Sequence, residues 1–226
     1  MPTPTDTRPA TQPTPGDYFR DAKPELLKLI DPQGMRILDA GCAAGGNGEL
    51  MKRAGAGEVI GIELIPEAAE EARRHLDQVL VGDLASIDLA AVAAEPFDAV
   101  LAVDVLEHLV DPAEALARLV ETLKPGGLLV ASIPNVAHVW VIASLFAARW
   151  PQKDGGIFDR THLRFFARRD MVRLLTEAGL EVTAVRPYFT RYRSLKILSL
   201  VLSLYVFRGY FARQYLLVGR RPSAGT

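Results

Sequence analysis

The stretch ILDAGCAAGG, residues 37–46, joins a short apolar run to a glycine-rich turn. The apolar run predicts a buried β-strand, and the glycines at 41, 45 and 46 predict a tight turn into a following helix. In a doubly wound α/β sheet, a turn of this kind at the end of the first strand binds a ligand. Asp39 places a carboxylate two residues ahead of the turn. The stretch therefore predicts both the fold and the position of its site.

The rest of the chain continues the same rhythm. Apolar runs typical of strands occur at 35–41, 58–64, 78–82, 97–105 and 127–133, and two further ones at 181–187 and 214–219. Helical patterns lie between or beside them at 46–54, 66–76, 111–123, 137–149 and 169–178. Alternation of strands and helices is typical of βαβ units in a parallel sheet. The sequence therefore predicts an α/β fold.

Composition favours one globular domain in the cytoplasm. The chain has 226 residues, of which 49% are hydrophobic, and this suits a single sizeable core over residues 17–226. Residues 1–16 are polar and proline-rich, so we expect a disordered tail rather than a signal peptide. The single cysteine, Cys42, excludes an intramolecular disulfide. With a net charge of −1 and no recognisable RNA-binding module, we expect no nucleic-acid partner.

Charge is divided unevenly along the chain. Residues 1–150 carry a net charge of −10 and residues 151–226 a net charge of +9, with eight basic residues and no acid from Arg186 onward. Within this arm we expect residues 189–212 to form a basic, apolar helical insertion before the last strand. Its run ILSLVLSLYVF, 197–207, is too short to span a bilayer.

Two roles for the arm remain open at this point. The first is peripheral contact with an anionic membrane, such as the inner surface of the cell membrane. The second is packing in the core or against the acceptor, with the arginines pairing with acids of the first half.

The ligand can be inferred from the sign of the charge around the turn. The glycine spacing fits either a dinucleotide fingerprint or a nucleoside-binding turn, and Glu63 would accept ribose hydroxyls in both cases. Asp39, however, would repel a pyrophosphate and attract a ligand that carries an ammonium and a sulfonium. Asp83 and Asp104, which also stand at predicted strand ends, add to this negative charge, although Asp83 would serve equally well as a helix cap. The sequence thus favours S-adenosylmethionine over the nicotinamide cofactor of a dehydrogenase.

The sequence resembles the class I S-adenosylmethionine-dependent methyltransferases from about Tyr18 to Arg221. The motifs ILDAGCAAGG, VIGIEL, VGDL, FDAVLAVDVLEHL and LKPGGLLVASIPN occur in the family's order and spacing. The resemblance implies a Rossmann-like, seven-stranded, mostly parallel sheet with helices on both faces. It also implies a cofactor site in which Asp39, Gly41 and Gly45 hold the methionine end, Glu63 the ribose, and Asp83 with Leu84 the adenine.

Ala43 departs from the family pattern, which usually has glycine at this position of the turn. A methyl group is tolerated best where the backbone has a negative φ. We therefore expect a negative φ at Ala43.

Methyl transfer is an in-line displacement that needs alignment rather than a protein nucleophile, but a hydroxyl acceptor must also lose a proton. The motifs DVLEH and DRTHLRFF place Asp104, His108 and His162 as candidates for this step. They resemble the acid-x-x-Glu-His motif of ubiquinone-pathway O-methyltransferases and of small-RNA 2′-O-methyltransferases. That resemblance implies a site for Mg²⁺ made of Asp104, Glu107, His108 and His162. The alternative is that Glu107 and His108 only shape the floor of the cleft.

The acceptor is less defined by the sequence. The stretch IFDRTHLRFFARRDMVRLLTEAGLEV resembles bacterial methyltransferases of sugar, O-antigen and secondary-metabolite pathways. The sequence therefore predicts methyl transfer to a hydroxyl of a small molecule, a sugar or a lipid-linked acceptor. The alternatives are an N- or C-methyltransferase of a secondary metabolite and a non-catalytic protein that binds S-adenosylmethionine.

Overall fold

A computed structural model of the chain describes residues 22–189 and 208–223. The predicted tail, residues 1–16, lies outside these ranges, as does most of the predicted insertion at 189–212. At the described end of that insertion, Arg208–Phe211 forms a 3-10 helix, η3. The disordered tail and the helical insertion therefore stay predictions.

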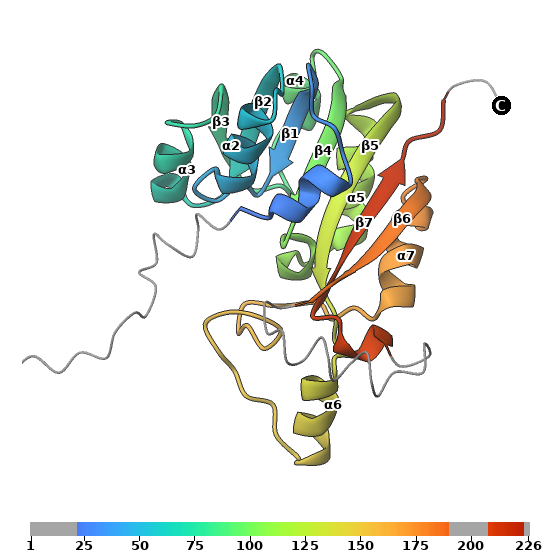
Figure 1. Cartoon of the computed structure of the whole chain (residues 1–226). Helices are drawn as coiled ribbons and strands as arrows, with labels where there is room; N and C mark the ends of the chain where they lie inside the picture. The colour runs from blue at the N-terminus through green and yellow to red at the C-terminus, as the bar shows by residue number, and fades with distance from the viewer. Residues whose placement is uncertain (1–21, 190–207, 224–226) are drawn as a thin grey trace, which may run out of the picture.

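Seven strands form one sheet in the order β3-β2-β1-β4-β5-β7-β6 (Figure 1). The strands are β1 (Arg36–Ala40), β2 (Glu58–Glu63), β3 (Gln78–Val81), β4 (Phe97–Val103), β5 (Leu123–Pro134), β6 (Glu181–Tyr188) and β7 (Gln214–Arg220). Pairing is parallel from β3 across to β5, and β7 runs antiparallel to both of its neighbours. The predicted Rossmann-like, mostly parallel sheet is confirmed.

Helices cover both faces of the sheet. The helices that precede η3 are η1 (Pro24–Lys28), α2 (Gly46–Arg53), α3 (Pro66–Ala72), α4 (Leu89–Val92), η2 (Leu106–His108), α5 (Pro112–Glu121), α6 (Val139–Phe146) and α7 (Arg168–Glu177). One core cluster packs η1, α2 and α3 against the sheet, and a second packs α4, α5 and α7. Ile37 belongs to the first cluster and its neighbour Leu38 to the second, because successive strand residues point to opposite faces.

Local sequence explains where these elements begin and end. The side chain of Asp111 accepts hydrogen bonds from the backbone N–H of Ala113 and Glu114, and Pro112 opens α5. This helix ends at Glu121, and β5 begins two residues later, so the KPGG motif lies inside the irregular start of the strand. The pairing of β4 with β5 shifts register there, between Phe97 and Ala99. The short helix α4 was not predicted, because four residues are too few to show a period.

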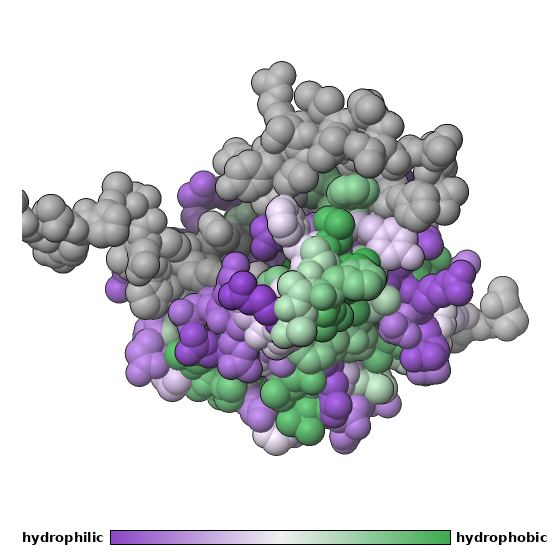
Figure 2. Space-filling model, turned by 90° about the horizontal axis from the view of Figure 1, so that it is seen from below, coloured by the Kyte–Doolittle hydropathy of each residue, from purple (hydrophilic) through white to green (hydrophobic). Residues whose placement is uncertain are grey.

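The helix α6 stands apart from the two layers and extends below the sheet in Figure 1. Figure 2 shows hydrophobic side chains gathered at the centre of the face seen from that side. Within the described residues, no helix has both the length and the apolar composition needed to cross a membrane.

Candidate active site

The turn after β1 needs its glycines for two physical reasons. Gly41 and Gly45 have φ values of 74° and 85°, which lie in the left-handed region. A side chain at Gly41 would also collide with Val105, and one at Gly45 would come within 3.1 Å of the Ala72 Cα atom. The turn therefore lies tightly between the end of β4 and helix α3.

Ala43 has a φ of 48°, so the expectation of a negative φ there was wrong. The backbone N–H of Ala43 donates a hydrogen bond of 2.8 Å to Oε2 of Glu63, at the end of β2. The other oxygen, Oε1, accepts a 2.9 Å bond from the backbone N–H of Ile65. The buried carboxylate therefore fastens the turn, and this bond helps to offset the cost of a left-handed alanine.

Asp39 is 1% exposed, and within the described part of the chain its Oδ2 atom has no hydrogen-bond partner. Burial raises the pKa of Asp39 to about 7, and the charge of Glu63 adds to this, while a hydrogen bond with the backbone of Gly48 opposes it. A buried carboxylate with an unpartnered oxygen is costly unless a cation comes close. The cationic methionine end of S-adenosylmethionine would supply that charge.

The loop after β3 carries Asp83, which is exposed, and Leu84, which is buried. Oδ1 of Asp83 accepts a 2.9 Å bond from the backbone N–H of Ala85, so the carboxylate also shapes its own turn. From α5, the Arg118 guanidinium donates to the carbonyls of Leu84 (2.8 Å) and Ala85 (2.7 Å) and to that of Ile87. Sequence reasoning missed Arg118, because an arginine in an amphipathic helix gives no local signal of such a contact.

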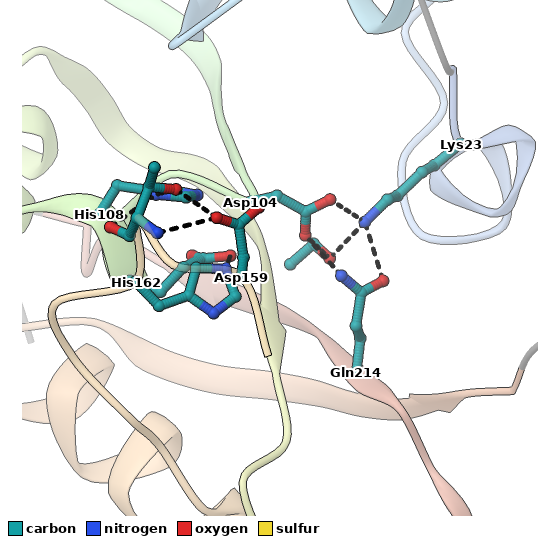
Figure 3. A network of polar contacts seen from close by, with 9 residues as sticks. Lys23, Asp104, His108, Asp159, His162 and Gln214 are labelled. Atoms are coloured by element: carbon teal, nitrogen blue, oxygen red, sulfur yellow. Dashed lines mark hydrogen bonds and ion pairs between the residues drawn. The ribbon is translucent and has the colours of Figure 1, made fainter. Parts of the chain in front are cut away.

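A second group of side chains lies beyond β4, in η2 and the loop that follows α6. The structure brings Glu107, His108 and His162 together, with one potential ligand atom of each within 4.8 Å of the others. Nε2 of His162 is 4.0 Å from Oε1 of Glu107, and the two imidazole rings meet edge to face with centroids 4.8 Å apart. These three of the four predicted metal-site residues therefore share one site (Figure 3).

Glu107 is the buried member of this group. It is 1% exposed, and neither carboxylate oxygen has a hydrogen-bond partner among the described residues. Burial raises the pKa of Glu107 well above its usual range, and the charge of Asp104 raises it further. Its carbonyl accepts the backbone N–H groups of Leu163 (2.9 Å) and Arg164 (3.0 Å), which fixes the loop that carries His162.

The loop also orients the two histidines. Nδ1 of His108 lies 3.2 Å from the carbonyl and 3.1 Å from the hydroxyl of Thr161. That hydroxyl donates a 2.6 Å bond to Oδ1 of Asp159. Burial lowers the pKa of His162, the nearby His108 lowers it further, and Asp159 opposes the shift. These shifts favour the neutral imidazole of His162, the form that can accept a proton.

Asp104 is not a member of this group in the structure, and the four-residue ligand set stays a prediction. Its carboxylate pairs with Lys23 and accepts hydrogen bonds at Oδ1 from Ser132 (2.8 Å) and Gln214 (2.9 Å). The backbone φ of 56° at Asp104 is left-handed. Figure 3 shows Asp104 with Lys23 and Gln214 on one side and the histidines on the other. Because Lys23 comes from a polar stretch with no recognisable motif, sequence reasoning missed it.

Comparison with known proteins supports the family that the sequence resembles. Residues 16–185 match the family described as "Methyltransferase domain". The chain is 36% identical over 165 residues to a ubiquinone biosynthesis O-methyltransferase of Cereibacter sphaeroides, covering 70% of this chain and 64% of that relative. A second protein of that name from another strain is 34% identical over 178 residues, covering 76% and 68%. About a third of each relative's length thus lies outside the match.

Among solved structures, an S-adenosylmethionine-dependent methyltransferase from Mesorhizobium loti superposes with a TM-score of 0.64 at 18% identity, covering 88% of this chain and 96% of that one. This likeness shows the fold. Taken with the family match, it places the chain among the class I S-adenosylmethionine-dependent methyltransferases. The fold, the glycine turn and the acid-lined strand ends are those that the sequence predicted for this family.

Proposed function

We propose that the protein transfers the methyl group of S-adenosylmethionine to a hydroxyl of a small molecule. The observation that carries the proposal is the group of Glu107, His108 and His162 beside the strand ends that hold the cofactor turn. An O-methyltransferase needs a proton acceptor there, and the relatives named ubiquinone biosynthesis O-methyltransferases support a hydroxyl as the accepting group. A base in this place contributes about 10²–10⁴-fold to the rate.

Each part of the site has a separate task in this proposal. Asp39 and the glycine turn hold the methionine end, Glu63 the ribose, and Asp83 with Leu84 the adenine. Alignment of the methyl group with the acceptor oxygen supplies most of the rate, and effective molarities allow about 7–11 kcal/mol for it. The neutral imidazole of His162 takes the proton of the acceptor, with His108 beside it.

The Glu107 group also suits a divalent ion, of which the Mg²⁺ expected from the sequence is one candidate. Mg²⁺ prefers oxygen ligands, whereas this group offers one carboxylate and two imidazoles, since Asp104 is bound to Lys23. Two histidines and one carboxylate favour a transition metal such as zinc or iron. Bound there, the ion would lower the pKa of the acceptor hydroxyl.

The experiment uses purified protein, labelled S-adenosylmethionine and an extract of the cells that produce the protein. His108→Ala and His162→Ala are expected to lower label transfer by about 10²-fold while S-adenosylhomocysteine affinity stays near wild type. His75→Ala is the matched control, because this histidine follows α3 and lies beside Glu49 and Glu71, outside the Glu107 group. Full transfer in both site variants would remove the histidines from the mechanism. Label found on a nitrogen or carbon of the product would overturn the hydroxyl acceptor.

Metal dependence is tested on the same protein. If the ion takes part, chelation abolishes transfer, zinc or iron restores it better than Mg²⁺, and Glu107→Gln weakens metal binding measured by calorimetry. Transfer that is unaffected by chelators would leave His162 as the base without an ion.

We further propose that the acceptor is membrane-associated or lipid-linked and that the basic arm from Arg186 onward contacts an anionic membrane surface. The net charge of +9 over residues 151–226, the last third of the chain, supports the proposal. Residues 190–207 of the arm lie outside the described residues. Salt-sensitive sedimentation with anionic vesicles, and none with neutral ones, is the expected result.

A further inference from the structure

The composition of α6 would suit a core helix, but its position does not. Its eight residues, VWVIASLF, include no charged side chain, yet within the helix the structure buries only Val141. Trp140 is 61% exposed and Phe146 is 89% exposed. Exposed aromatic residues in such a number are unusual on a surface that meets only water.

The apolar surface continues into the loop that follows the helix. Trp150 meets Phe158 and Phe165 edge to face, with ring centroids 5.3 and 5.2 Å away. Leu145, Leu163 and Phe165 are each about half exposed. We call Trp140, Leu145, Phe146, Trp150, Leu163 and Phe165 the α6 surface. The helix α6 lies on the side of the molecule that Figure 2 shows, where hydrophobic side chains gather at the centre.

The charges next to this surface have one sign. From residue 135 to residue 153 the chain has no acidic residue, and it has two basic ones, Arg149 and Lys153, both exposed. The first acid beyond them, Asp154, is paired with Arg160 at 2.8 Å. Tryptophan and phenylalanine next to arginine and lysine suit the boundary between lipid headgroups and acyl chains. A surface of this composition favours anionic lipid over a protein partner.

The same segment leads into the active site. It starts at the end of β5, where the buried ring of His138 accepts a 3.2 Å bond from the backbone N–H of Trp140 and so caps α6. It returns through Asp159 and Thr161 to His162, which lies beside Glu107. Contact of the α6 surface with a membrane would therefore hold the histidine loop next to the lipid.

We propose that the α6 surface docks on an anionic membrane and that α6 lies in the interface with its aromatic side chains among the lipids. The proposal rests on the membrane-associated acceptor proposed above, and it identifies a second contact besides the basic arm. Burial of apolar surface provides adhesion, and Arg149 and Lys153 add attraction to anionic headgroups.

Flotation of the full chain with vesicles tests the proposal, using phosphatidylcholine alone and a mixture of phosphatidylcholine and phosphatidylglycerol. Trp140→Ser with Phe146→Ser is expected to weaken binding to the mixed vesicles by about tenfold or more. Arg149→Gln with Lys153→Gln weakens binding by a smaller factor and reduces its dependence on salt. The matched control is Leu27→Ser with Val81→Ser, since these exposed apolar residues lie on η1 and β3. The control should bind like wild type.

Other measurements separate this proposal from its alternatives. Unchanged melting temperature and S-adenosylhomocysteine affinity of the aromatic variant show that it is folded. Wild-type binding by that variant overturns the proposal, and so does loss of binding only in Arg193→Gln with Lys196→Gln, which leaves the arm as the sole contact. If the aromatic variant instead converts a dimer to a monomer in ultracentrifugation and wild type does not float, the surface is a subunit contact. Methyl transfer measured in solution tests the proposed function independently of all these outcomes.

Discussion

Lys23 and Asp104 form an ion pair that joins the segment before η1 to the end of β4. The Lys23 side chain is 13% exposed, and its Nζ atom also donates to Oγ of Ser132 and Oε1 of Gln214, each at 2.9 Å. The backbone N–H of the same residue donates a 2.9 Å bond to Oδ1 of Asn47, at the start of α2. One residue thus connects the start of α2 with the ends of β4, β5 and β7.

Replacement of this lysine should therefore destabilise the fold. Lys23→Met is expected to lower the free energy of unfolding by about 1–3 kcal/mol, because it leaves two carbonyl or hydroxyl acceptors and a carboxylate without their donor. We expect a value in the lower part of this range, because Asp104 is partly exposed and water screens its charge. Chemical denaturation measures the change.

A double-mutant cycle with Asp104→Asn separates the ion pair from the packing of the lysine. A coupling energy of about 0.5–3 kcal/mol is expected for residues in direct contact. Additive effects of the two substitutions would show that the pair contributes nothing beyond its separate hydrogen bonds.

Arg118 gives a prediction about the adenine end of the cofactor site. Arg118→Met removes the donors to the carbonyls of Leu84, Ala85 and Ile87, so the loop after β3 loses its support from α5. We expect S-adenosylhomocysteine to bind about tenfold more weakly to this variant. We also expect the variant to discriminate less well between S-adenosylhomocysteine and its inosine analogue. Calorimetry with both ligands measures the two effects.

Arg118→Lys keeps the charge but loses the planar fork that reaches three carbonyls, so it should recover only part of the affinity. Equal weakening of both ligands, with the discrimination intact, would show that Arg118 supports the fold in general and not the adenine loop.

The fold could be predicted because its signals are local. Each buried strand is marked in the sequence by an apolar run, and the start of α5 is marked by Asp111 and Pro112. The same holds for the glycine turn, because φ values of 74° and 85° at Gly41 and Gly45 require the residue type that the sequence shows. The prediction of φ failed at Ala43, because the hydrogen bond from its N–H to Glu63 joins positions 20 residues apart.

The surroundings of Asp104, Glu107 and the two histidines were predicted less completely, because their contacts join residues far apart in the sequence. The motif that contains Glu107 and His108 and the one that contains His162 could be recognised separately, and the structure brings them together. The pairing of Asp104 with Lys23, however, spans 81 residues. It depends on where the segment before η1 crosses the sheet, which no periodicity or spacing records.

The left-handed alanines offer a test of backbone strain. Ala43 and Ala148 have φ values of 48° and 52°. Glycine adopts this conformation without a Cβ penalty, so Ala43→Gly and Ala148→Gly should each raise the free energy of unfolding, by up to about 1 kcal/mol. Thermal denaturation in parallel measures both.

Ala148 is the matched control, because it follows α6 and lies far from the cofactor turn in the sequence. S-adenosylhomocysteine affinity should stay within about twofold in both variants, since the turn keeps its shape. A stability loss in Ala43→Gly alone would mean that the methyl group packs favourably and that the turn is not strained.

The buried carboxylate of Asp39 predicts a dependence of stability on pH. Burial raises its pKa from 3.8 to about 7 in the folded protein, so the unfolded chain ionises at lower pH than the folded one. The contribution of Asp39 to stability is therefore most favourable below pH 3.8, the pKa in the unfolded chain, and it falls as pH rises toward 7. Near pH 7 the folded protein must ionise a carboxyl group that is shielded from water. Asp39→Asn removes this cost, and at pH 8 the cofactor-free variant should be more stable than wild type by about 2–4 kcal/mol.

The same carboxylate should be required for the ligand, with the opposite effect of pH. Ionised Asp39 attracts the ammonium of S-adenosylhomocysteine, so wild-type affinity should fall as pH drops below about 7, while Asp39→Asn binds at least about tenfold more weakly at pH 8 and shows no such fall. Calorimetry between pH 5.5 and 8.5 measures affinity, and denaturation over the same range should show the stability gap narrowing toward pH 5.5. If the variant follows the same pH profile as wild type in both measurements, another group titrates and Asp39 is not the residue that receives the cationic end of the cofactor.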